Sequence, residues 1–426
     1  MLTSRRMLSL LLAVAAAAAI LSGCYAAPVS EATEQGGETS DAIVTDSKLP
    51  VTTYPVPEEN IRAFGNMAAS ASTGGFWQWN TFFRPYIQAY DPVTRTTYVP
   101  CYQSGCRHND PTCNACFGDL QYLVEYRGNY YALVFTDDGT ASALVTRPLS
   151  GGPLQILASW KPENEDEACR CVLRYVSFGK AYVTANRETY ALTEDGQLTT
   201  AAQESSLVSV DLQTGEVSTI LENDDGYDLY GVWEDIAAFR MLEMAEDAPE
   251  FEDWLAQQPE GTSWDEYDRQ FLRFRFLIRN LKTGEETVLV DASENFIRTV
   301  DPHRSWGQYA VYQVDRSLYV YDLEKQAAKK LFTYEQNWDF YNYMILDGHV
   351  IAICGTENSC RVWAIDITDE VVTELDTRSG NVMVFSTDYE CDGYFKGLLT
   401  EPSGNVEEYY ISKEDFYRSN YDGAFR

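Results

Sequence analysis

A hairpin pattern recurs along this chain at a nearly constant spacing, and this repeat limits the fold more than any other feature. In each copy an alternating apolar strand ends at Asp or Asn, a polar turn follows, and a second short strand begins. Asn280 and Asp322 lie 42 residues apart, and Asp322 and Asp366 lie 44 apart. Asp211 precedes Asn280 by 69 residues, or by 43 once the segment 245–270 is set aside. A repeat of about 40–45 residues with several strands in each unit is the spacing of β-propeller blades.

We therefore predict an all-β chain folded as a β-propeller, with a β-sandwich or several small β domains as the alternative. The turns agree, because an Asp or Asn side chain caps the turn and Gly supplies the positive φ at which two strands reverse. Seven blocks of strand pattern predict seven blades, over residues 62–100, 119–158, 169–221, 228–290, 296–332, 338–375 and 381–412. Six blades result if the first and last blocks share one blade, and such sharing would close the ring.

The segment 245–270 interrupts the repeat and has helical periodicity, which predicts a short helical insertion. Ser263 followed by Glu266 resembles a capping box that opens a helix. Aromatic residues recur in the same segment, and an exposed aromatic face there would serve as a binding platform. The candidate binding residues are Phe251, Trp254, Trp264 and Tyr267.

Residues 1–23 are expected to form a lipoprotein signal peptide. Arg5 and Arg6 precede an apolar run over 7–20 that is too short to cross a bilayer comfortably. The Leu-Ser-Gly-Cys that follows resembles the bacterial lipobox, which implies that Cys24 is acylated as a diacylglycerol-cysteine, with palmitate as a typical chain. The alternative is an ordinary cleaved signal with an incidental cysteine, and export through either the general secretory or the twin-arginine route stays open. Lipidation implies a protein anchored to the cell membrane on its extracytoplasmic side.

Residues 24–60 are rich in Ser, Thr, Glu, Gly and Pro and have little that could form a core. This composition predicts a disordered linker that tethers the folded body to the membrane. Residues 61–426 are then the propeller domain.

The formal net charge of −33 limits the partners of the chain. Nucleic-acid binding needs clustered Lys and Arg, so we expect no nucleic-acid partner. Docking to anionic lipid through protein charge is disfavoured for the same reason, which leaves the acyl chain as the membrane anchor. The simplest interpretation of the acidity is that it keeps a surface protein soluble and monomeric.

A cysteine-rich loop over residues 101–118 is the strongest chemical motif. It reads CYQSGCRHNDPTCNACFG and holds one of the three histidines in the chain. Zinc takes four nitrogen or sulfur ligands in a tetrahedron, so the sequence predicts a structural zinc site. The candidate ligands are Cys101, Cys106, His108 and Cys113, with Cys116 as an alternative ligand. Two disulfides in the loop are an equal alternative for an exported protein, and a redox or catalytic thiol is a third.

Other cysteines give weaker predictions. Cys354 and Cys360 flank a short turn, so we expect them to bridge a hairpin as a disulfide. Cys169 and Cys171 would share one face of a strand at a separation too large for a disulfide, so they are expected to find other partners.

The block 90–119 is similar to a segment in a family of lipoproteins from gut Firmicutes of the clostridial group. The matching residues are Asp91, Pro100, Cys101, Cys106, His108, Asp110, Cys113 and Ala115. The C-terminal EEYYISKEDFY at 407–417 is also similar to the ending of that family. The resemblance implies a propeller on a Gram-positive cell surface and implies no activity, and Cys116 lies outside the shared pattern.

The sequence shows no nucleophile elbow, HExxH, phosphate-binding loop or dinucleotide-binding glycine signature. We therefore expect no enzymatic activity and predict a tethered binding module for a glycan, a peptide or an envelope protein. A structural or assembly factor of an envelope complex is the first alternative. A carboxylate-based enzyme acting on glycans is the second.

Overall fold

The computed structural model describes most of the chain after residue 50. The described residues are 44–45, 51–65, 67–70, 75–80, 84–109, 112–136, 139–193, 198–222, 226–259, 262–291, 305–314, 316–334, 339–356, 359–375, 386–400 and 406–425. The expected signal peptide and Cys24 lie outside these residues. None of the helices in the described part has the length and apolar character that a membrane crossing requires.

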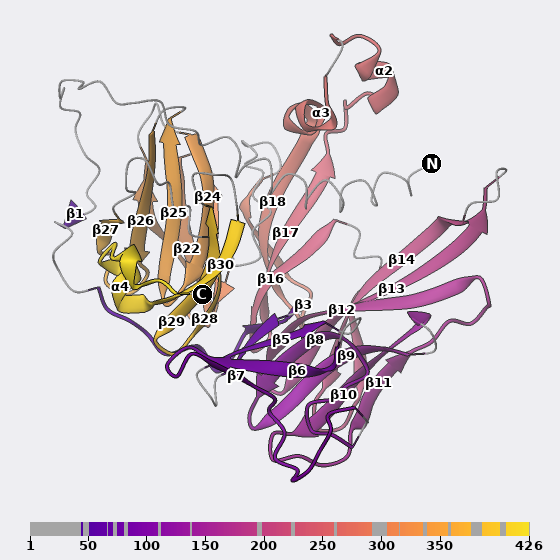
Figure 1. Ribbon diagram of the computed structural model, residues 1–426. Coiled ribbons are helices and arrows are strands. Elements are labelled where there is room, and N and C mark those ends of the chain that lie inside the picture. The colour runs from indigo at the N-terminus through magenta and orange to yellow at the C-terminus, as the bar shows by residue number, and fades with distance from the viewer. Residues whose placement is uncertain are drawn as a thin grey trace.

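The described strands form seven sheets arranged in a ring, so the chain is a seven-bladed β-propeller (Figure 1). Each of the seven blocks of sequence pattern makes one antiparallel sheet, which confirms the prediction of seven blades. The six-blade alternative is wrong, because the first and last blocks form separate sheets.

The blades follow the order of the chain. The first strands of most neighbouring blades contact one another, so these strands lie innermost in the ring. Blade 1 consists of β4 (Met67–Ser70), β5 (Gly75–Asn80), β6 (Arg84–Asp91) and β7 (Thr96–Tyr98). Blade 2 consists of β8 (Asp119–Tyr126), β9 (Asn129–Thr136), β10 (Ala141–Pro148) and β11 (Gln155–Trp160). Blade 3 consists of β12 (Glu167–Ser177), β13 (Lys180–Leu192), β14 (Leu198–Asp211) and β15 (Val217–Glu222). Blade 4 consists of β16 (Tyr227–Trp233), β17 (Ile236–Met244), β18 (Leu272–Asn280) and β19 (Glu286–Val290), and blade 5 of β20 (Ser305–Trp306), β21 (Tyr309–Val314), β22 (Ser317–Asp322) and β23 (Ala327–Thr333). Blade 6 consists of β24 (Asp339–Leu346), β25 (His349–Thr356), β26 (Ser359–Asp366) and β27 (Val372–Leu375). Blade 7 consists of β28 (Ser386–Cys391), β29 (Tyr394–Thr400) and β30 (Val406–Ser412).

The repeated Asp or Asn turns join the two outer strands of a blade, as the sequence predicts. In blade 3 the carboxylate of Asp211 accepts hydrogen bonds from the backbone N–H groups of Gln213 and Thr214, at 2.9 and 2.8 Å. Gly215 follows with φ of +74°, and a Cβ added there would lie 2.6 Å from the carbonyl oxygen of Leu157. The turn therefore needs glycine both for its backbone conformation and for its contact with blade 2.

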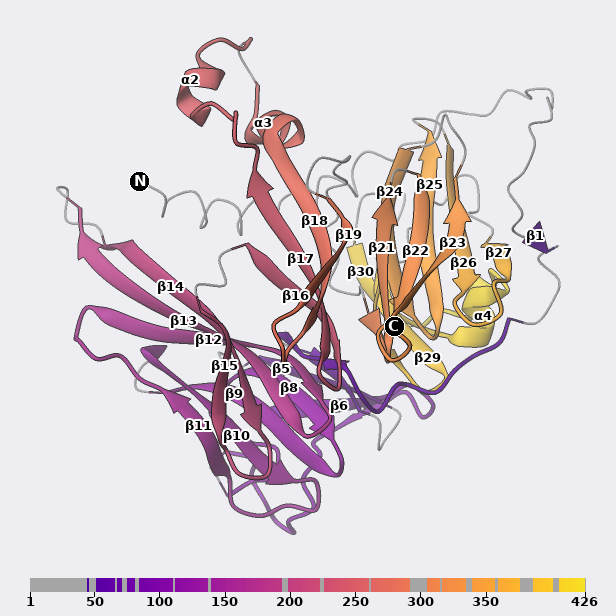
Figure 2. The ribbon, with the colours of Figure 1, turned by 180° about the vertical axis from the view of Figure 1, so that it is seen from behind.

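The helical insertion also forms as predicted. Helices α2 (Phe251–Leu255) and α3 (Trp264–Phe271) lie between β17 and β18 of blade 4, and Figure 2 shows them projecting beyond the ring. The backbone N–H of Ser263 donates to the carboxylate of Glu266 at 3.3 Å, which is one half of the predicted capping box. Two short helices end the chain, α4 (Lys413–Tyr417) and η2 (Tyr421–Gly423).

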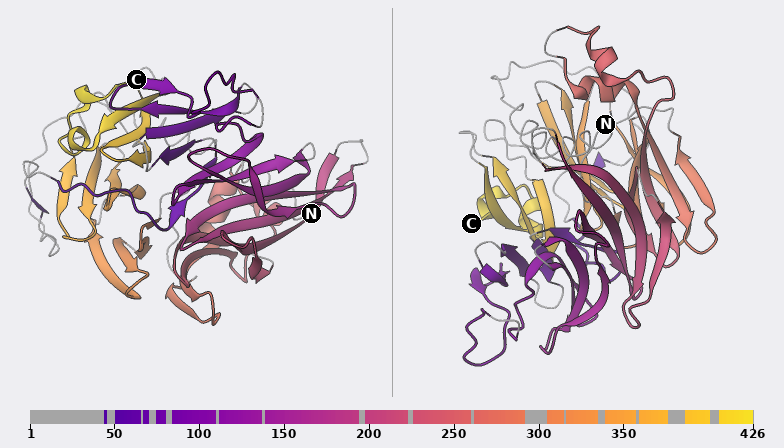
Figure 3. Two further views of the ribbon diagram at one scale, coloured as in Figure 1. Left: turned by 90° about the horizontal axis from the view of Figure 1, so that it is seen from below. Right: turned by 90° about the vertical axis from the view of Figure 1, so that its right-hand side faces the viewer.

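The predicted disordered linker is wrong in its last ten residues. Residues 51–60 cross one face of the ring (Figure 3), and the short strands β2 (Ile61–Arg62) and β3 (Phe64–Gly65) then pair with β12 and β8. Further upstream, β1 (Val44–Thr45) pairs in parallel with β27. The polar side chains of this segment hydrogen-bond to the blades, so it has partners that its composition does not indicate.

Candidate functional site

The connection from β7 to β8 brings the predicted metal ligands together. The ligand atoms of Cys101, Cys106, His108 and Cys113 all lie within 4.8 Å of one another. The Cys113 side chain is buried, and the other three are half-buried. Three sulfurs and one imidazole nitrogen at this separation can bind one tetrahedral metal ion.

Backbone amides surround the sulfur atoms of this cluster in a repeated way. Each of the three cysteines accepts a hydrogen bond from the N–H of the residue two positions later, which is Gln103 for Cys101, His108 for Cys106 and Ala115 for Cys113. Donors aimed at sulfur stabilise the thiolate, which is the form that binds metal. The loop is therefore folded to support negative sulfur.

The pKa values of two of these thiols move in opposite directions. Burial alone would raise the pKa of Cys101, but the hydrogen bonds from the N–H groups of Gln103 and Asn114 hold it below its ordinary value. The deeper burial of Cys113 raises the pKa of its thiol well above the ordinary range. A bound cation would reverse this effect of burial, because it stabilises the thiolate directly.

His108 completes the cluster through its Nδ1 atom, which lies 3.3 Å from Sγ of Cys113. The residue has φ of +56°, a conformation that turns the loop sharply after Cys106. The ring of Tyr86, on β6 of blade 1, lies 5.8 Å from the imidazole, centroid to centroid.

Other contacts fix the loop between blades 1 and 2. Arg147 on β10 is fully buried and donates to the carbonyl oxygens of Cys113 and Cys116, at 2.5 and 3.2 Å. The N–H of Ile87 on β6 donates to the carbonyl of Ala115 at 3.0 Å. Since residues of both blades hydrogen-bond to the loop, the loop ties the two blades together.

Cys116 is buried beside the cluster, and its thiol hydrogen-bonds with that of Cys113. It lies outside the group of four whose ligand atoms are mutually close. Cys116 as an alternative ligand therefore stays a prediction.

The remaining cysteine predictions have different outcomes. In blade 6, Cys354 lies opposite Arg361 and Cys360 lies opposite Gly355, so the two cysteines are not directly cross-strand neighbours. The side chain of Cys360 lies outside the described part, so their disulfide stays a prediction. Cys169 and Cys171 are buried and unbridged.

The aromatic residues of the insertion do not form an exposed platform, which corrects the expectation for them. The side chains of Phe251, Trp254 and Tyr267 are buried, and Trp264 is half-buried and stacked on Phe251. These four residues pack on one another, since two helices that project from the ring need a core of their own.

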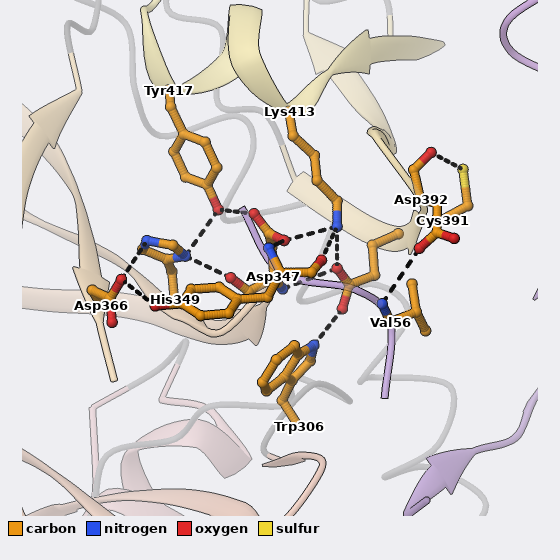
Figure 4. Close-up of polar contacts among 11 residues, drawn as sticks. Val56, Trp306, Asp347, His349, Asp366, Cys391, Asp392, Lys413 and Tyr417 are labelled. Carbon is orange, nitrogen blue, oxygen red and sulfur yellow. Dashed lines mark hydrogen bonds and ion pairs between the residues drawn. The ribbon is translucent and has the colours of Figure 1, made fainter. Parts of the chain in front are cut away.

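A network of buried charged side chains joins blades 6 and 7, and no motif in the sequence predicted it (Figure 4). The ammonium of Lys413 lies 2.8 Å from Oδ1 of Asp347 and 3.0 Å from Oε2 of Glu390, and all three side chains are buried. Tyr417 donates to Oδ2 of Asp347 at 3.0 Å, and the indole of Trp306 donates to Oε1 of Glu390 at 2.8 Å. Lys413 and Tyr417 belong to the C-terminal SKEDFY, and the resemblance of that ending was the one signal that pointed to this region.

His349 lies at the edge of this network with its imidazole buried. Nδ1 lies 2.6 Å from the carbonyl oxygen of Asp347, and Nε2 lies 3.5 Å from Oδ2 of Asp366. Burial lowers the pKa of His349 below its ordinary value of 6.5, and the nearby carboxylates offset only part of this shift.

This shift predicts a pH dependence of stability. The unfolded chain binds a proton at His349 near pH 6.5, whereas the folded chain does so only at lower pH, so the contribution of His349 to stability is lost as the pH falls below 6.5. We expect the unfolding free energy to fall more between about pH 7.5 and about pH 5.5 in the wild type than in His349→Gln, by about 1 kcal/mol. Urea unfolding at both pH values measures this difference, and parallel profiles would contradict it.

Polar residues also lie on the innermost strands, which line the centre of a propeller. Asp228 on β16 lies 3.0 Å from the guanidinium of Arg240 and 3.9 Å from that of Arg174, which stands on β12. The side chains of Arg174 and Asp228 are each 30% exposed, so solvent reaches them. These charged groups join the innermost strands of blades 3 and 4.

No protein-family model matches this chain, and no curated protein matches it. Among solved structures, the chain is similar to an oligogalacturonate lyase in complex with manganese, with 15% identity over 85% of this chain and 84% of that chain and a TM-score of 0.38. It is similar to the β-propeller domain of the Trilobed protease from Pyrococcus furiosus, with 11% identity over 84% and 94% and a TM-score of 0.43. It is also similar to TolB from Acinetobacter baumannii, with 11% identity over 83% and 77% and a TM-score of 0.34. At these identities the likeness concerns the fold alone and carries no activity to this chain.

Proposed function

We propose that this chain is an extracytoplasmic lipoprotein, anchored through Cys24, whose propeller acts as a binding module for a glycan, a peptide or an envelope protein. The N-terminal sequence supports the anchor, through its charged start, its apolar run and its lipobox-like ending. The single observation that supports binding is the set of partly exposed charged side chains on the innermost strands, Arg174 and Asp228. Ligands of propellers and barrels commonly reach such central positions.

A binding experiment tests this proposal. The full-length protein is probed with arrays of cell-wall glycans, host glycans and peptides, and a ligand is expected that binds the wild type and binds Arg174→Gln at least about tenfold more weakly. Arg418→Gln is the matched control, because the Arg418 side chain is 64% exposed and lies outside the centre of the ring. Turnover of a bound glycan would replace the binding module by the enzyme alternative, and capture of an envelope complex without any free ligand would favour the assembly factor.

We also propose that the cysteine–histidine cluster holds a structural zinc ion through Cys101, Cys106, His108 and Cys113. Thiolate and imidazole ligands suit zinc, whereas carboxylates and water suit manganese, magnesium and calcium. Four protein ligands leave no open coordination position, which is the arrangement of structural zinc rather than catalytic zinc. The ion would fix the loop that joins blades 1 and 2.

Elemental analysis of the purified full-length protein tests the metal. One zinc per chain is expected, together with thiols that react only after chelation. Two disulfides in the loop and no bound metal would contradict the zinc site while leaving the binding module untouched.

A further inference from the structure

The ring of this propeller is closed without a shared strand. Apart from the short strands β1, β2 and β3, which add to blades 6, 3 and 2, each described blade comes from one continuous stretch of chain, and no described strand joins blade 1 to blade 7. The seam between these blades depends on side chains, since the ring of Tyr90 stacks on Tyr410 at 4.2 Å and the guanidinium of Arg95 lies 4.0 Å from the ring of Phe425. A shared strand would join the first and last blades by backbone hydrogen bonds, and without one the seam relies on packing between blades and on contacts from elsewhere in the chain.

The segment 51–65, which we name the clasp, crosses the ring and contacts blades on both sides of it (Figure 3). At its start, Tyr54 binds blade 6. Its backbone N–H donates to Oδ1 of Asp347 at 2.7 Å and its hydroxyl donates to Oδ2 of Asp366 at 2.8 Å. The N–H of Val56 reaches Asp392 of blade 7 at 3.4 Å, as Figure 4 shows.

Asn60 ties three blades at one point. Its side-chain amide donates to the carbonyl of Gly307 in blade 5 at 2.7 Å, and its Oδ1 accepts from the N–H of Val232 in blade 4 at 2.9 Å. Its own N–H donates to the hydroxyl of Ser177 in blade 3 at 3.0 Å. Asn60 is 4% exposed and has φ of +60°, a conformation that asparagine tolerates better than most residues.

Glu59 ties blades 2 and 3 in a similar way. Its carboxylate accepts from the hydroxyl of Tyr126 at 3.0 Å and from the guanidinium of Arg127 at 2.6 Å, both in blade 2. It also accepts from the N–H of Phe178 in blade 3. Most of the residues that contact the clasp lie in the turn after the first strand of a blade. These turns lie on the same face of the ring, so the clasp runs along that face.

The ring is shaped to receive the clasp. A Cβ added at Gly348 would lie 2.6 Å from a ring carbon of Tyr54, and one added at Gly231 would lie 2.8 Å from Cβ of Ser305 and 3.0 Å from the side-chain nitrogen of Asn60. Glycine at both positions leaves the space in which the clasp side chains lie. Strands β2 and β3 then continue the clasp into blades 3 and 2 before the chain enters blade 1.

From these contacts we infer that residues 51–65 close the propeller in place of a shared strand. The clasp links blades 2 to 7 across the centre, and it joins blade 1 through the chain itself. It also occupies the mouth on its own face, so a ligand reaches the centre of the ring from the opposite face, where the insertion projects. This role needs neither the lipid anchor nor the zinc ion.

Hydrogen exchange on the full-length protein tests the clasp at a distance from the substitution. In Asn60→Gly the backbone conformation stays accessible, and only the bonds to blades 4 and 5 made by the side chain are lost. Amides at the seam, in β28 to β30 and in β4 and β5, are expected to exchange about tenfold faster or more, although the hydrogen bonds of Asn60 go to blades 3, 4 and 5.

Two comparisons make this test decisive. Glu58→Gln changes an exposed neighbour on the same segment and is expected to leave exchange at the seam unchanged. Glu59→Gln weakens the ties to blades 2 and 3 and is expected to speed exchange at the seam as well. If Asn60→Gly accelerates exchange only near residues 232 and 307 and leaves the seam unaffected, the clasp has a local role and the inference is wrong.

Discussion

Replacing Cys113 by serine is expected to abolish the proposed binding of zinc and to destabilise the protein by on the order of 3–5 kcal/mol, because the energy of a structural metal site is also folding energy. Cys113 is the buried ligand of the four, and a serine hydroxyl does not ionise to supply the charge that its thiolate would. The loop would then lose one of the four ligand atoms that lie within 4.8 Å of one another. Zinc content by elemental analysis and urea unfolding measure the two effects.

Two matched cysteines serve as controls for Cys113→Ser. Cys116→Ser removes a buried thiol next to the cluster, and it is expected to keep the zinc because Cys116 lies outside the set of four. Cys169→Ser removes a buried thiol in blade 3 and leaves zinc content unchanged. Equal zinc in the wild type and in Cys113→Ser would show that this cysteine is no ligand, and loss of zinc in Cys116→Ser alone would assign the fourth position to Cys116.

The blade arrangement follows from the sequence because each blade is built from local hairpins. The Asp and Asn turns at 91, 211, 280, 322 and 366 carry the repeat, and each turn is capped by a hydrogen bond from a backbone N–H two or three positions later. Such short-range interactions can be predicted from a few consecutive residues of the sequence. The cysteine–histidine cluster is local in the same sense, since its four ligands lie within 13 residues of sequence.

The clasp and the ionic network depend on distant contacts and could not be found in this way. Asn60 lies in a stretch with the composition of a disordered linker, and its partners are 117 to 247 residues away. The prediction of an exposed aromatic face on the insertion was wrong for a related reason. Periodicity shows that Phe251 and Trp254 share one side of a helix, but it does not show that α3 covers that side.

The largest loss of stability away from the metal is expected from Lys413→Met. The ammonium of Lys413 is the cation that neutralises Asp347 and Glu390, and its removal leaves two carboxylates buried without a counter-charge. Removing one partner of a buried ion pair destabilises a protein by about 3–5 kcal/mol, which is more than most surface ion pairs contribute to stability. Denaturant unfolding near neutral pH measures the loss.

A double-variant cycle separates this charge effect from a loss of packing. Glu390→Gln in the Lys413→Met background removes one of the two stranded charges, so it is expected to recover about 1–3 kcal/mol of the loss. Burial already raises the pKa of Glu390, so lowering the pH toward the range in which this carboxyl protonates should also narrow the gap between Lys413→Met and the wild type. Lys325→Met is the control, because the ammonium of Lys325 pairs with Asp322 at 2.9 Å while its side chain stays 68% exposed, and little change is expected. Two results would contradict this prediction: Lys413→Met being no more destabilising than Lys325→Met, or its loss of unfolding free energy being the same at every pH. Either would mean that Lys413 does not stabilise the charges of Asp347 and Glu390 and that the network stabilises the ring through packing alone.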